Sequence, residues 1–191
     1  MRGTRVGPAV CRFILTCGVE PCRVVRCKGV GVDVSRSVLV PYSAEAMFDL
    51  IEQAEGYPSF LPWCTAAEIL ERSEDWVAAR LEISYAKLRF VMRTRNPKRR
   101  PEWLQVRLVE GPFKQFGGDW HLVPLADKGC KVTFQLSYQT AEGVFDRVAK
   151  AALDRIFDSI VDAFVRRAEA TLTPIGSNDR AVSGASDAAA P

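Results

Sequence analysis

Apolar and polar residues alternate with a period of two through much of the middle of the chain. Between residues 76 and 85, for example, Val77, Ala79, Leu81 and Ile83 alternate with small or polar side chains. This period places one face of a strand against a core and the other in water, as in an antiparallel sheet. The pattern predicts strands at 35–40, 66–73, 76–85, 87–95, 102–109, 115–123 and 130–138.

A longer period, close to 3.6 residues, begins after the last of these strands. Apolar residues including Ile156, Ile160 and Phe164 recur there every three or four positions and predict a helix over about 144–171. At 1.5 Å per residue this helix would be roughly 40 Å long. A helix of that length must lie across a large apolar surface, and the concave face of the sheet is the expected partner.

Two shorter helices are expected after the first strand. Ser43 is a suitable N-cap for a helix over 44–53, whose apolar side chains fall on one face. Gly56 and Pro58 interrupt the following stretch, which leaves room for only a short helix near 54–60. The order of elements therefore predicts an α+β fold, in which a curved antiparallel sheet of about seven strands grips a long C-terminal helix.

The length of 191 residues favours one domain with flanking segments. We expect the domain at 33–173 and a disordered, Ala-rich tail at 174–191. Residues 1–32 hold six basic residues and one acidic residue. They are interpreted as sequence upstream of the true start, as an organelle transit peptide or as a secretory signal. No apolar run reaches the roughly 18 residues of a membrane span, which predicts a soluble or peripheral protein.

The sequence offers little of the chemistry that catalysis or metal binding requires. The one histidine, His121, is placed by alternation on the wet face of its strand, and no nucleophile elbow, phosphate-binding glycine loop or HExxH motif occurs. Four of the six cysteines lie in 1–32 without CxxC spacing, and we expect Cys64 and Cys130 to be buried free thiols. We therefore assign no catalytic and no metal-binding residue, and we predict neither an enzyme nor a resident cofactor.

The run YPSFLPWC at 57–64 combines prolines, aromatic residues and a cysteine at fixed spacing. Shorter motifs accompany it, among them VPYSA at 40–44, TRN at 94–96, GPF at 111–113 and CKV at 130–132. Together these motifs resemble the coenzyme Q-binding and ribosome-association-toxin branch of the START-like domains, in the polyketide cyclase superfamily. The resemblance covers residues 35–172 and implies the helix-grip fold of that superfamily.

The resemblance implies more than one function. Mitochondrial members are described as quinone-binding chaperones that support respiration, and bacterial members as toxins that bind the large ribosomal subunit and block subunit joining. Superfamily members that cyclise polyketides add a cyclase-like enzyme as a further alternative. We expect the first function, with ubiquinone or another isoprenoid lipid as ligand and no DNA partner. The protein would then act in the cytoplasm at the anionic surface of the inner membrane, or in the mitochondrial matrix if 1–32 is a transit peptide.

An isoprenoid lipid needs a nearly continuous apolar site, because burying roughly 400 Å² of its tail gains on the order of 10 kcal/mol. We expect that site between the sheet and the final helix, with an opening at the loops 57–63 and 111–116. Tyr85, Tyr138 and Arg80 are candidate polar groups for the head, although spacing alone does not place them in the pocket. The predicted lipid-binding residues are Phe60, Leu61, Trp63, Leu81, Ile83, Phe90, Met92, Phe113, Trp120, Phe134, Ile156 and Ile160.

Basic residues concentrate between 87 and 107, where eight of them accompany one acid, Glu102. On a nearly neutral domain such a patch can contact ribosomal RNA phosphates or anionic lipid headgroups. The alternative is a solvated outer face of the sheet whose charges are paired. The predicted patch consists of Arg89, Arg93, Arg95, Lys98, Arg99, Arg100 and Arg107.

Overall fold

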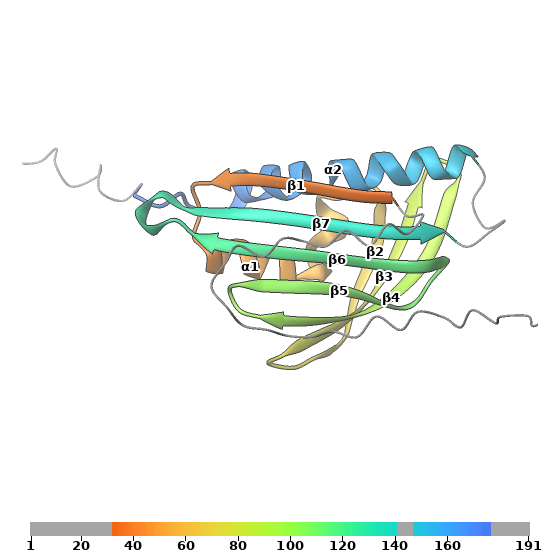
Figure 1. Ribbon diagram of the computed structural model, residues 1–191, viewed down its shortest axis with the longest axis horizontal. Coiled ribbons are helices and arrows are strands. Elements are labelled where there is room, and N and C mark those ends of the chain that lie inside the picture. The colour runs from red at the N-terminus through yellow and green to blue at the C-terminus, as the bar shows by residue number, and fades with distance from the viewer. Residues whose placement is uncertain (1–31, 141–146, 177–191) are drawn as a thin grey trace, which may run out of the picture.

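The computed structural model describes residues 32–140 and 147–176, and in them one antiparallel sheet of seven strands packs against a long helix (Figure 1). The predicted α+β helix-grip fold is confirmed. The strand order is β1-β7-β6-β5-β4-β3-β2. The strands are β1 (Val32–Val40), β2 (Cys64–Arg72), β3 (Trp76–Tyr85), β4 (Leu88–Arg99), β5 (Trp103–Glu110), β6 (Phe113–Pro124) and β7 (Cys130–Thr140).

The helices lie where the periodicity predicted them. Helix α1 (Ala44–Glu52) begins after Ser43, whose hydroxyl oxygen accepts a 3.1 Å hydrogen bond from the backbone N–H of Ala46. The short 3-10 helix η1 (Ala54–Ser59) follows, and a second one, η2 (Ala126–Lys128), precedes β7. Helix α2 (Arg147–Thr171) lies along the sheet, as Figure 1 shows. Its predicted start at 144 and the predictions for residues 1–31 and 177–191 fall outside the described residues.

The main difference from the predicted elements is the end of β4. A turn was expected at 96–101, but β4 continues to Arg99 and leaves only three residues before β5. Asn96 is buried there, and its side-chain oxygen accepts a 3.3 Å hydrogen bond from the backbone N–H of Arg107 on β5. This hydrogen bond satisfies the buried amide oxygen of Asn96, a residue that the sequence pattern had assigned to a solvated turn.

The core lies between the concave face of the sheet and α2, with α1 closing one end of the sheet. Cys64 and Cys130 are buried free thiols, as predicted. Burial raises the pKa of each thiol to about 11, which keeps both protonated at neutral pH. His121 is exposed, also as predicted. No helix in the described part of the chain is long and apolar enough to cross a bilayer.

Candidate functional site

A cavity of about 90 Å³ lies between the sheet and α2. Its wall is built almost entirely from apolar side chains of β3 to β7 on one side and of α2 on the other, with the loop after η1 completing it. Inward-facing residues of neighbouring strands stand opposite one another in this wall, for example Trp120 of β6 opposite Phe134 of β7. Their ring centroids lie 4.3 Å apart. The alternation that builds the strands therefore also builds the apolar wall.

Ten of the twelve predicted lipid-binding residues line this cavity, and Phe60 and Phe113 do not. Phe60 packs edge-to-face against Phe164, with ring centroids 5.2 Å apart, and Phe113 packs against Phe116 at 5.0 Å. Both rings therefore pack against residues of the wall without lining the cavity themselves. The ten that line the cavity are Leu61, Trp63, Leu81, Ile83, Phe90, Met92, Trp120, Phe134, Ile156 and Ile160.

Seven further residues of the wall were not among the twelve predicted lipid-binding residues. The inward alternation that selected Leu81 also applies to Val106 and Leu136, and the helical stripe that selected Ile156 also passes close to Phe157, so the signal for these was present. Tyr57 and Phe116 lie in the loops 57–63 and 111–116, which we expected at the opening of the site. The seven are Tyr57, Val106, Phe116, Gly118, Leu136, Phe157 and Phe164.

Aromatic rings bound the cavity in two clusters. One joins Phe116 and Phe157, whose ring centroids are 5.9 Å apart, to Tyr138, which lies 4.7 Å from Phe157. The other joins Tyr57 to Phe164 at 5.3 Å, and Phe164 in turn contacts Trp120 at 5.1 Å. These rings stand in the wall of the cavity or directly behind it.

The polar groups that we expected at the head of a lipid lie elsewhere. Arg80 forms a 2.7 Å ion pair with Glu82 on the same face of β3, and this face is opposite to the one that lines the cavity. The hydroxyl of Tyr138 donates to Asp154 of α2. Neither of these residues, nor Tyr85, is among the described residues that form the wall. None of these three candidate polar groups therefore lines the cavity.

Among the residues of the wall, Tyr57 carries a hydroxyl and Trp63 carries an indole N–H. The Tyr57 hydroxyl donates to the backbone carbonyl of Ile51, and burial raises the pKa of this phenol far above its ordinary value, so it stays neutral. The indole N–H of Trp63, a residue 8% exposed, is buried without a hydrogen-bond partner among the described residues. Such a group favours a ligand with an acceptor atom.

The seven residues of the predicted basic patch do not form a field of unpaired positive charge. Five of them contact acids: Arg93–Glu110 at 3.5 Å, Arg99–Glu102 at 3.6 Å, Arg100–Asp49 at 2.8 Å, Lys98–Glu52 at 2.7 Å and Arg107–Asp119 at 2.7 Å.

The two remaining members, Arg89 and Arg95, have no acidic partner within the described ranges, and Arg95 stacks over the Trp76 ring at 4.0 Å. The structure thus favours the alternative of a largely paired outer face over one uniform patch: Glu102 pairs locally with Arg99, and the other four acids come from outside residues 87–107, where counting along the sequence does not pair them.

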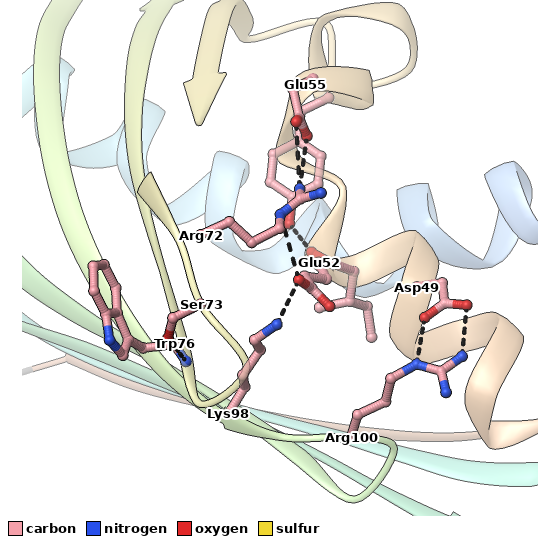
Figure 2. A network of polar contacts seen from close by, with 10 residues as sticks. Asp49, Glu52, Glu55, Arg72, Ser73, Trp76, Lys98 and Arg100 are labelled. Atoms are coloured by element: carbon pink, nitrogen blue, oxygen red, sulfur yellow. Dashed lines mark hydrogen bonds and ion pairs between the residues drawn. The ribbon is translucent and has the colours of Figure 1, made fainter. Parts of the chain in front are cut away.

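One of those pairs, Lys98–Glu52, belongs to a network that holds α1 and η1 against the sheet, and Figure 2 also draws the separate pair Arg100–Asp49 beside it. The Glu52 carboxylate, at the end of α1, accepts a 2.7 Å hydrogen bond from Lys98 of β4 and lies 3.6 Å from Arg72 of β2. Arg72 also pairs with Glu55 of η1 at 3.3 Å. Since η1 carries Tyr57, this network fixes one part of the cavity wall.

Comparisons with known proteins agree with this architecture. Residues 40–165 match the family described as polyketide cyclase / dehydrase and lipid transport. The ribosome association toxin RatA of Pseudomonas aeruginosa is 36% identical over 140 residues, which cover 71% of this chain and 94% of that protein. A mitochondrial coenzyme Q-binding protein of Xenopus laevis is 24% identical over 143 residues, which cover 72% of this chain and 58% of that protein.

Among solved structures, an aromatase/cyclase from Streptomyces sp. R1128 superposes with a TM-score of 0.65 and 18% sequence identity, covering 76% of this chain and 98% of that one. This likeness shows a shared fold. The two relatives described above are named as a toxin and as a binding protein and not as enzymes.

Proposed function

The chain belongs to the polyketide cyclase / dehydrase and lipid transport family, in the branch of ribosome association toxins and coenzyme Q-binding proteins, and on this premise we propose that its cavity binds an isoprenoid quinone. The observation that carries the proposal is the apolar cavity between the sheet and α2. Trp63 lines this cavity, and its buried indole N–H has no hydrogen-bond partner among the described residues. The name of the Xenopus relative adds the quinone as ligand class.

The cavity volume sets a condition on this function. About 90 Å³ is well below the roughly 300–1,000 Å³ of typical small-molecule pockets. A polyprenyl chain therefore needs α2 to move away from the sheet, or its tail must leave the cavity. Burying roughly 400 Å² of the tail in the protein is favourable by on the order of 10 kcal/mol. This free energy is comparable to the cost of moving the tail out of a bilayer. The protein would then act as a quinone chaperone at an anionic membrane surface on the cytoplasmic side.

Filling the cavity should abolish lipid loading. Val106→Phe adds ring atoms to the wall, and we expect at least a tenfold fall in the quinone that is extracted from the purified protein by organic solvent, since the tail then lacks its site. Val109→Phe is the matched control, because Val109 is on the same strand but 67% exposed. It should load like the wild type.

Two results of this experiment would contradict the proposal. An empty extract of wild-type protein from respiring cells, together with no quinone uptake from liposomes, would exclude lipid carriage. Equal loading of Val106→Phe and the wild type, with both folded, would exclude this cavity as the site.

A second function, association with the ribosome, is favoured by one specific observation: the Pseudomonas relative with that name is 36% identical, and this chain covers 94% of its length. The outer face of β4 supplies a contact surface, because Arg89 and Arg95 lack acidic partners in the described part of the chain, and Arg95 is stacked on Trp76. Arginine and an aromatic ring together suit contact with RNA phosphates and bases.

Expression in a bacterial host should then lower the fraction of 70S ribosomes in sucrose gradients. The Arg89→Glu/Arg95→Glu double variant should restore that fraction, because charge reversal replaces attraction to phosphate by repulsion. Lys128→Glu/Lys131→Glu, at the opposite end of the sheet's long strands, is the charge-matched control and should act like the wild type. Ribosome profiles that stay flat on expression of the wild-type protein would exclude this second function.

A further inference from the structure

A second cavity, of about 50 Å³, adjoins the first. Tyr57, Leu81 and Val106 line both cavities and therefore form the partition between them. The second cavity differs from the first in its polar groups, because the side chains of Thr94 and Asn96 of β4 belong to its wall. The smaller cavity therefore adds polar side chains to a mostly apolar wall, an arrangement that suits a molecule with an apolar tail and a polar head.

The hydroxyl of Thr94 is the unusual group in this second cavity. Thr94 is 2% exposed, and its oxygen has no hydrogen-bond partner among the described residues. The polar neighbours are already engaged: the Asn96 side-chain oxygen accepts from the backbone N–H of Arg107, and Glu52 accepts from Lys98. Burying a hydroxyl without a hydrogen-bond partner lowers the stability of the fold, so such groups are rare. Where one occurs, a bound ligand can supply the missing partner.

We propose that the second cavity is the head-group subsite, where the Thr94 hydroxyl hydrogen-bonds to an oxygen of the ligand while the tail occupies the first cavity. This inference rests on the proposed function and assigns the position of the oxygen-bearing head of the quinone within the site. A cavity of about 50 Å³ admits the oxygen-bearing edge of a ring. A pure hydrocarbon gains nothing from Thr94, because it offers no hydrogen-bond partner.

The test compares two probes that differ only in the head: decyl-benzoquinone and decylbenzene. Binding is followed by the fluorescence of Trp63 and Trp120, which line the first cavity. Thr94→Val, which exchanges the hydroxyl for a methyl group, should weaken decyl-benzoquinone about tenfold and leave decylbenzene within about twofold. Thr94→Ser keeps the hydroxyl and should bind both probes like the wild type.

Thermal unfolding of the ligand-free protein gives an independent readout. Because Thr94→Val removes an unpaired buried hydroxyl, its melting temperature should equal or exceed that of the wild type. A lower melting temperature with unchanged quinone affinity would mean that the hydroxyl is satisfied by water alone, and this would overturn the subsite. Unchanged affinity of Thr94→Val in a wild type that binds decyl-benzoquinone would overturn the subsite but not the proposed function. Failure of the wild type to bind either probe would overturn the proposed function itself.

Discussion

Replacing Glu52 by leucine should destabilise the protein by about 3–5 kcal/mol, because it leaves the Lys98 ammonium buried without its partner. The Lys98 side chain is 8% exposed and that of Glu52 is 12% exposed, so water cannot replace the lost carboxylate. Arg72, 3.6 Å from the same carboxylate, adds a second positive charge to the vacated site (Figure 2). Urea unfolding of the Glu52→Leu variant measures the loss.

A double variant separates this explanation from simple repacking. Glu52→Leu/Lys98→Met replaces the buried pair by two apolar side chains and should recover most of the lost stability, because no unpaired charge remains. Asp49→Asn is the control for an exposed pair: it breaks the Asp49–Arg100 contact, which water screens, and should have a much smaller effect. A Glu52→Leu variant as stable as Asp49→Asn would show that the network of Figure 2 does not hold α1 and η1 in place.

Replacing Gly129 by alanine should cost more than about 3 kcal/mol and lower the melting temperature by roughly 10 °C or more. Gly129 has a backbone φ of 113°, a region that residues with a Cβ rarely adopt. A Cβ at this position would stand 1.9 Å from the carbonyl oxygen of Val40 and 2.8 Å from the Cα of Pro41. Both obstacles are backbone atoms, so neither can move aside without displacing the end of β1.

Gly56→Ala is the matched control, because a Cβ on Gly56 of η1 meets nothing within 4 Å. The melting temperature of Gly56→Ala should therefore stay close to that of the wild type, while that of Gly129→Ala falls. Thermal unfolding of both variants measures this difference. A Gly129→Ala protein that melts with the wild type would mean that the β6–β7 connection does not press against β1 as the structure shows.

The alternation of side chains makes the strands and their faces predictable from the amino-acid sequence alone. It places Leu81, Trp120 and Phe134 on the inward face because polarity alternates along each strand, and all three line the cavity. Each inference concerns residues a few positions apart, where the period of the backbone fixes which way a side chain points. Phe113 was predicted from the loop 111–116 and not from this alternation, and it packs against Phe116 without lining the cavity.

Contacts between distant segments could not be predicted from the same pattern. The sequence pattern assigns Lys98 to a solvated basic turn, but α1 brings Glu52 to within 2.7 Å of it from 46 positions away in the chain. Arg80, a candidate polar group for a lipid head, is on the outer face beside Glu82. Charge counts along the chain cannot reveal such pairs, because ion pairing depends on distances in space.

The sequence by itself determined the element order, the inward faces of the strands and the apolar stripe of the closing helix, because each follows from the local period of polarity. Only the tertiary structure decided that a cavity under α2 adjoins a smaller one beside α1 and η1, that Thr94 lines the smaller one without a partner among the described residues, and that five of the seven predicted patch residues contact acids. Those features depend on how side chains from distant segments fill or fail to fill a shared volume, which no local pattern encodes.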